Sequence, residues 1–118
     1  MRKYIGLLLL MSVVLTAYGQ KEYNASLFGI KSNGTTLNTT SIQKAIDYIS
    51  ENGGGTLHFY VGRYLTGTIF LKSNVTVNLH EGAILLGSTN PYDYREVEKV
   101  RMSAFIAAFQ ADNIAIVG

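Results

Sequence analysis

The chain has 118 residues, a length that suits a single domain. It contains no cysteine, which excludes a disulfide scaffold, a thiolate metal site and a cysteine nucleophile. Ten Lys and Arg residues stand against eight Asp and Glu residues, without any basic cluster of the kind that nucleic-acid binding requires.

The first nineteen residues have the pattern of a signal peptide. Arg2 and Lys3 are followed by an apolar run over 5–15, and Ala17 and Gly19 are the small residues that signal peptidase accepts. The run is shorter than the roughly twenty residues that span a bilayer. We therefore expect residues 1–19 to be removed and residues 20–118 to form a secreted or periplasmic domain with no membrane span. Without Arg2 and Lys3, eight basic and eight acidic residues remain, so we expect no nucleic-acid partner.

One amphipathic helix is predicted over residues 40–52, in "TTSIQKAIDYISENGGG". Thr40 is placed as an N-cap, and Gln43 stands three residues later, where it can complete a capping box. The glycines at 53–55 end the helix because glycine adopts the left-handed C-cap conformation at little cost. The helix is recognised by one apolar stripe: Ile42, Ala45, Ile46 and Ile49.

After Gly55 the sequence predicts short strands separated by glycine and asparagine, over 57–61, 64–66, 68–71, 75–79 and 84–86. Both a β-sandwich and a stacked β-solenoid are consistent with this spacing of strands and turns. The side chains of Val75, Val77, Leu79 and Ile84 are expected to point into the core.

An internal echo favours the solenoid. The segment "KSNVTVNL" at 72–79 resembles "ADNIAIVG" at 111–118, and Asn74 matches Asn113 after 39 residues. The polar segment "NPYDYREVEKVRMS" at 90–103 between them predicts a protruding loop. A recurring asparagine is typical of stacked coils, because its side chain can hydrogen-bond to the turn of the next coil.

The same residues resemble the N-terminal region of pectin-degrading glycoside hydrolases of the polygalacturonase type. The resemblance runs over 27–118 and rests on an ordered series of motifs. It departs from the family at 60–61, where a proline is usual, and at 37–39, where an acidic pair is usual. The motifs are Phe28-Gly29, "IQKAID" at 42–47, "GGGT" at 53–56, Gly62-Arg63-Tyr64, "GTIFLKSN" at 67–74 and "GAIL" at 82–85.

The resemblance implies an all-β, right-handed parallel β-helix whose first coils, within residues 20–118, are capped by the amphipathic helix. It also implies hydrolysis of α-1,4-galacturonosyl linkages in pectin with inversion, by a monomeric enzyme that needs no cofactor. The family's acidic motifs, "N-x-D" and "DD", do not occur here. We therefore assign no catalytic, cofactor-binding or metal-ligating residue, and expect an inactive segment of a larger enzyme. A rhamnogalacturonan hydrolase, a pectate-lyase-like enzyme and a non-catalytic polysaccharide-binding β-helix are the alternatives.

The polar residues that are present are not expected to form a catalytic or metal site of their own. Asp47 and Glu51 are expected to form a solvated helix face, and His58 and His80 to be surface or turn residues, since their spacing of 22 residues matches no known metal motif. A solvated loop is expected for Asp93, Glu96 and Glu98 with Arg95, Lys99 and Arg101. A binding module would use tyrosines as its platform: Tyr60, Tyr64, Tyr92 and Tyr94.

Overall fold

The computed structural model describes residues 21–97, 102–108 and 110–118, and the signal peptide predicted at 1–19 lies outside them. A single α-helix, α2 (Thr39–Glu51), and two short 3-10 helices, η1 (Ala25–Phe28) and η2 (Pro91–Asp93), are described. The described strands are β1 (Glu22–Asn24), β2 (Gly55–Phe59), β3 (Gly62–Thr66), β4 (Ile69–Leu71), β5 (Val75–Leu79), β6 (Ala83–Gly87), β7 (Arg95–Val97), β8 (Met102–Ala104), β9 (Ile106–Ala108) and β10 (Ala115–Val117). None of the helices in this part of the chain is long and apolar enough to cross a membrane.

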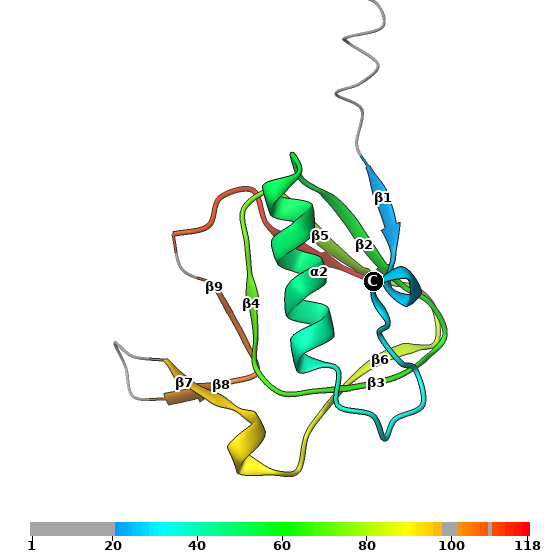
Figure 1. Cartoon of the computed structure of the whole chain (residues 1–118), viewed down its shortest axis with the longest axis vertical. Helices are drawn as coiled ribbons and strands as arrows, with labels where there is room; N and C mark the ends of the chain where they lie inside the picture. Colours follow the sequence, from blue (N-terminus) through cyan, green and yellow to red (C-terminus); the bar gives the residue numbers. More distant parts are fainter. Residues whose placement is uncertain (1–20, 98–101, 109) are drawn as a thin grey trace, which may run out of the picture.

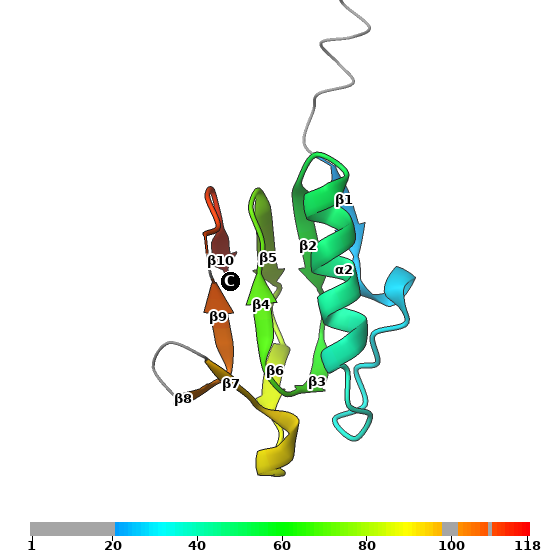
Figure 2. The ribbon, with the colours of Figure 1, turned by 60° about the vertical axis from the view of Figure 1, so that its left-hand side comes forward.

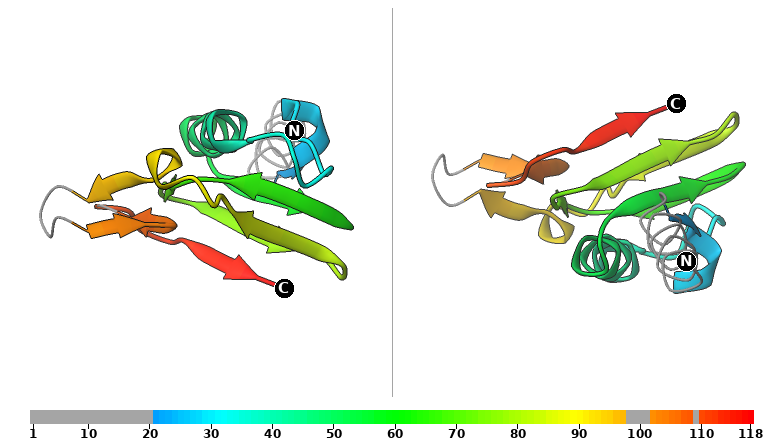
Figure 3. Two further views of the ribbon diagram at one scale, coloured as in Figure 1. Left: turned by 90° about the horizontal axis from the view of Figure 1, so that it is seen from below. Right: turned by 90° about the horizontal axis from the view of Figure 1, so that it is seen from above.

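The strands stack as coils of a parallel β-helix, which confirms the solenoid and excludes the sandwich (Figures 1 and 2). One coil consists of β2, β3 and β4, and the next consists of β5, β6 and β9. Each strand pairs in parallel with its counterpart: β2 with β5, β3 with β6 and β4 with β9. Strand β1 pairs with β2 before the first coil, and β10 pairs with β5 to begin a third. Figure 3 shows strands of successive coils lying in layers, with α2 on one side of the stack and the C-terminal strand on the other.

The offset of 39 residues in the sequence echo has a simple structural cause. Gly55 pairs with Val75 twenty residues later, which is one plain coil, whereas Val77 pairs with Ile116. The difference is the insertion between β6 and β9, where 90–103 was predicted to be a loop. It contains η2 and an antiparallel hairpin of β7 and β8 that projects from the stack (Figure 1).

The turns before β2, β5 and β10 each have a left-handed residue, and these three residues occupy equivalent positions in successive coils. Asn74 has a φ of 66° and Asn113 a φ of 57°, and the Asn113 side-chain amide donates to Oδ1 of Asn74 at 3.2 Å. The predicted asparagine ladder is therefore confirmed. In the first coil, the equivalent residue is Gly54, which has a φ of 88°. A Cβ at Gly54 would lie 2.6 Å from the backbone oxygen of Asn74. Only glycine fits that position.

Helix α2 closes the N-terminal end of the stack, as Figure 2 shows. Its predicted apolar stripe is fully buried and packs on the side chains of the first coil. Burying one such isoleucine stabilises the fold by about 1.5–3 kcal/mol, so the stripe is a major part of the core. The core residues of the helix and the coils are Ile42, Ala45, Ile46, Ile49, Leu57, Phe59, Tyr64, Ile69, Leu71, Val75 and Val77.

The capping box predicted at Thr40 and Gln43 is wrong. The helix begins at Thr39 after Asn38, whose side chain does not cap it. Asn38 is instead 1% exposed, and its amide accepts from Lys31 N and donates to Lys31 O, both at 2.8 Å. The predicted helix end is confirmed, because Gly54 N donates to Ile49 O in the pattern of a Schellman motif.

One of the four predictions of core residues in the strands is also wrong. Val75 and Val77 are buried and Leu79 packs against the core, but Ile84 is 50% exposed. The alternation of Val75, Val77 and Leu79 continues through the turn to Ala83 and Leu85, which pack against the core, and Leu85 pairs with Tyr64. Ile84 therefore lies on the outer face.

Candidate functional site

The described residues contain one compact cluster of chemically capable side chains on the outer face of the first sheet. Tyr60 and His80 stack at 4.4 Å between ring centroids with an interplanar angle of 16°, and His58 lies 4.9 Å from His80. Nδ1 of His58 and Nε2 of His80 are 2.7 Å apart. Nε2 of His58 contacts the Glu22 carboxylate. Strands β1 and β2, the turn after β2 and the turn after β5 thus bring one carboxylate and three rings together.

The carboxylate determines which nitrogen of His58 has the proton. An ionised carboxylate accepts hydrogen bonds and cannot donate them, so Nε2 of His58 is the donor to Glu22. In the neutral ring, Nδ1 of His58 then has a lone pair, and it faces Nε2 of His80. The His58 side chain is only 16% exposed, whereas Glu22 is 58% exposed at the rim. The cluster is a hydrogen-bonded chain of carboxylate, imidazole and imidazole.

Sequence reasoning missed this cluster. His80 does lie in a turn, as predicted, but the two histidines were treated as isolated side chains. Phe59 pairs with Leu79, so the following residues, Tyr60 and His80, meet one coil apart. The signal that was available is the spacing: 22 residues is one coil plus the two-residue step that returns a strand to the same face.

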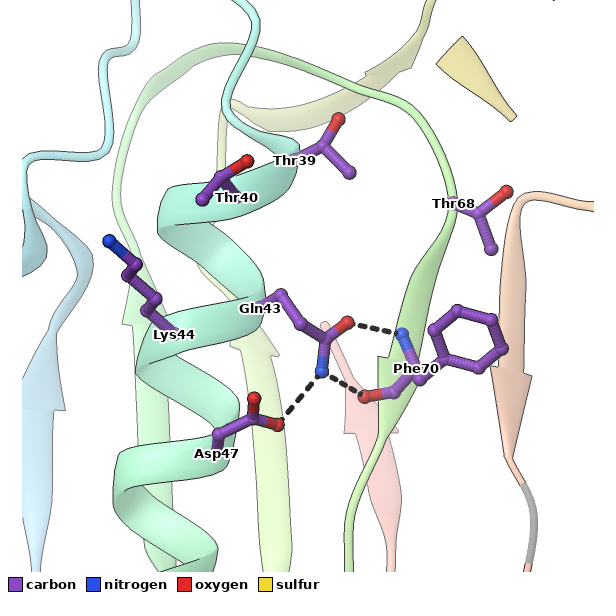
Figure 4. Close-up of a pocket in the computed structure, with 7 residues that line it drawn as sticks. All are labelled: Thr39, Thr40, Gln43, Lys44, Asp47, Thr68 and Phe70. Carbon is purple, nitrogen blue, oxygen red and sulfur yellow. Dashed lines mark hydrogen bonds between the residues drawn. The ribbon is translucent and has the colours of Figure 1, made fainter. Parts of the chain in front are cut away.

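A second feature is a hollow of about 290 Å³ between α2 and β4, shown in Figure 4. Its polar groups hold the helix to the strand. Gln43 accepts from Phe70 N at 2.8 Å through Oε1 and donates to Phe70 O at 2.9 Å through Nε2. Asp47 Oδ1 accepts from the same Nε2 at 3.0 Å. The lining residues are Thr39, Thr40, Gln43, Lys44, Asp47, Thr68 and Phe70.

The acidic residues do not form a pair of facing carboxylates in this hollow. Asp47 is half-buried and engaged with Gln43, while Glu51 is exposed at the helix end, so the solvated face predicted for both holds only for Glu51. Asp93 accepts from the Ser88 hydroxyl in the turn before the hairpin. Glu98, Lys99 and Arg101 lie outside the described residues, as do the side chains of Arg95 and Glu96.

The tyrosines do not form one shared platform. Tyr64 is buried, packs edge-on against Phe59 and donates to Tyr60 O at 2.8 Å. Burial raises the pKa of the Tyr64 phenol above its ordinary value, against the lowering effect of that hydrogen bond. Tyr92 is 94% exposed, and the Tyr94 hydroxyl donates to Ser88 O. Tyr64 therefore cannot stack on a sugar, contrary to what a tyrosine platform requires.

Comparison with known proteins relates the chain to pectin-degrading enzymes. No family model matches it. It is 45% identical over 80 residues to an exo-poly-α-D-galacturonosidase from Dickeya chrysanthemi, an alignment that covers 68% of this chain and 13% of that protein. The chain spans less than a fifth of the length of the first curated relatives that it matches.

Solved structures give the same relationship. A protein described as a glycosyl hydrolase from Parabacteroides merdae is 56% identical, with a TM-score of 0.77 over 83% of this chain and 42% of that one. The family 28 exopolygalacturonase of Yersinia enterocolitica is 35% identical, with a TM-score of 0.68 over 82% of this chain and 19% of that one. The predicted right-handed parallel β-helix is confirmed. In sequence and in fold, the chain is similar to a part of polygalacturonase-type proteins.

Proposed function

We propose that this chain is the first part of a secreted or periplasmic glycoside hydrolase that cleaves α-1,4-galacturonosyl linkages of pectin with inversion. The observation that carries the proposal is the agreement of two independent comparisons, since both the sequence and the coil architecture match polygalacturonase-type proteins. The substrate is then a pectic polysaccharide or oligogalacturonide, and the complete enzyme is a monomer without a cofactor.

Within this enzyme, residues 20–118 would have a structural role. Helix α2 covers the end of the stack, and β10 offers its free side to a further coil. An uncovered solenoid end exposes apolar side chains and unpaired backbone groups, so a cap is required for solubility. We place the catalytic carboxylates on coils outside residues 1–118, at the separation of roughly 6.5–9.5 Å that admits the attacking water in inverting enzymes. Residues 1–19 would direct export.

The test uses the product of the complete reading frame, assayed on polygalacturonate for new reducing ends. Inversion is checked by NMR of the first anomer released, which should have the β configuration. The 118-residue chain, assayed in parallel, should release no product. Activity in that chain would contradict the placement of the carboxylates.

The other outcomes separate the alternatives. Unsaturated products that require calcium would identify a lyase, because β-elimination needs a base and a cation to stabilise the carbanion. Cleavage of rhamnogalacturonan in preference to polygalacturonate would change the substrate. Binding of pectin without any cleavage would identify a non-catalytic module, and the hydrolase proposal would be abandoned.

A further inference from the structure

The histidine cluster has a property that the proposed hydrolase does not use. Nδ1 of His58 and Nε2 of His80 face one another at 2.7 Å, while Glu22 fixes the proton of His58 on the opposite nitrogen. A single proton on Nε2 of His80 is therefore enough to form the hydrogen bond between the two rings. If His80 has its own proton on Nδ1, two lone pairs converge on the same point.

We propose that His58 and His80 form a binding site for a divalent transition-metal cation of the imidazole-preferring kind, namely Cu²⁺, Ni²⁺ or Zn²⁺. Neutral imidazole nitrogens are preferred ligands of these ions, and calcium and magnesium prefer oxygen. The cation takes the place of the shared proton, with water in its remaining positions. No group of three or more metal-ligating side chains exists among the described residues, so this is a two-histidine site.

The required adjustment is small. Zinc–nitrogen bonds of about 2.0–2.1 Å in tetrahedral geometry set two ligand nitrogens roughly 3.3 Å apart, so the rings must separate by about half an ångström. His58 is held on β2, but His80 lies in the turn between β5 and β6 and is partly exposed. The movement therefore falls on the His80 side chain alone, because the His80 backbone is held by a hydrogen bond from His80 N to Phe59 O at 2.9 Å.

The surroundings match those of a metal-bound histidine. Such a histidine typically donates its other ring N–H to a carboxylate, which fixes the tautomer and makes the ring a stronger ligand. Glu22 occupies this place against His58. Tyr60 stacks on His80 and limits its rotation, so the second ligand is oriented as well.

The chain offers an unusually clean test, since these are its only two histidines. The untagged full chain is titrated with CuCl₂, NiCl₂ and ZnCl₂ by calorimetry and by NMR of the two imidazole C2 protons. We expect one cation per chain, affinity in the order Cu²⁺ above Ni²⁺ and Zn²⁺, and no response to Ca²⁺ or Mg²⁺. Both imidazole signals should shift or broaden together.

Variants then assign the ligands. H58Q and H80Q should each lose most of the affinity, and E22Q should weaken binding by about tenfold or more, because the carboxylate acts through His58. E51Q removes another exposed carboxylate, at the end of α2, and serves as the control that keeps wild-type affinity. Far-UV circular dichroism verifies that each variant is folded.

Two results would overturn the proposal. One is a folded wild-type chain whose imidazole signals do not respond to millimolar Cu²⁺, Ni²⁺ or Zn²⁺, which would leave a simple proton-sharing pair. The other is H80Q with unchanged affinity, which would move the binding to another group. Since neither measurement depends on pectin cleavage, the metal site is tested independently of the hydrolase function.

Discussion

Substitution of Gln43 by leucine tests how the cap is fastened to the solenoid. Gln43 is half-buried on α2, and its side-chain amide pairs with both backbone groups of Phe70 on β4, as a neighbouring strand would (Figure 4). Two other helix side chains make similar contacts: Thr39 Oγ1 accepts from Gly67 N at 2.7 Å, and Ser50 donates to Ser73 O at 2.8 Å. Gln43→Leu keeps a branched side chain, one atom shorter than that of Gln43, and removes its bidentate contact.

The expected loss follows from the number of hydrogen bonds and their exposure. A buried peptide group that loses its partner costs about 1–3 kcal/mol, and two such groups are affected. Phe70 is partly exposed, so water can replace some of the interaction. We therefore expect the free energy of unfolding to fall by about 2–3 kcal/mol, and the leucine cannot recover this because it has no polar atoms.

The assay is urea denaturation followed by far-UV circular dichroism. With a slope of about 1–3 kcal/mol per molar urea for a chain of this size, the midpoint should fall by roughly 1 M. Lys44→Leu is the matched control, since Lys44 is the next residue and is exposed. Gln43→Glu provides a further check: it still accepts from Phe70 N but cannot donate to Phe70 O, and it should also be destabilised.

A Gln43→Leu variant within about 0.5 kcal/mol of the wild type, the usual range for an exposed substitution, would refute this reasoning. It would mean that the buried isoleucines alone hold the helix in place. A loss of similar size in Lys44→Leu would show that the effect belongs to leucine on this helix and not to the contact with β4.

Three further substitutions test other parts of the fold. Gly54→Ala should cost about 1–3 kcal/mol more than Gly53→Ala, because both glycines have positive φ but only at Gly54 would the Cβ collide with Asn74; equal losses in urea denaturation would remove the collision as the cause. Asn38→Ala should cost about 2–4 kcal/mol, since its buried amide makes two hydrogen bonds to the backbone of Lys31; a stability matching the wild type would show that water replaces them. The raised pKa of Tyr64 means that its contribution is complete below the pKa of the unfolded phenol, about 10, and is lost as pH rises through the folded value. Tyr64→Phe should remove that alkaline part of the stability profile, and an unchanged profile would assign it to other groups.

Much of the local structure could be predicted from residue patterns because each element has a short-range cause. The four apolar residues of α2 recur at helical spacing, and all four are buried. The glycines that end the helix, and the left-handed asparagine before β5, are determined by the conformations that their own side chains permit. A repeat in the sequence favours the solenoid over the sandwich, since Asn113 and Asn74 occupy the same position in successive coils. The right-handed parallel β-helix is what the family resemblance implies.

Most of the errors arose where the answer depends on contacts between distant segments. The exception is Ile84: the alternation of Val75, Val77 and Leu79 continues through the turn at 80–82 to Ala83 and Leu85, and leaves Ile84 on the outer face. Gln43 was assigned to its own helix terminus, since no local pattern shows that β4 lies beside it. The sequence predicts a loop for the polar segment 90–103, but part of this segment forms the antiparallel pair of β7 and β8.

The sequence by itself therefore determined α2, the strands β2 to β6 and the turns between them, because these depend on periodicity and backbone preference within a few residues. Only the tertiary structure decided which side chains meet. His58 and His80 come together with Glu22 because one coil returns the chain to the same face after about twenty residues. That return depends on the length and direction of every turn in the coil, so the spacing of 22 residues between the histidines identifies the pair only once the fold gives the length of a coil.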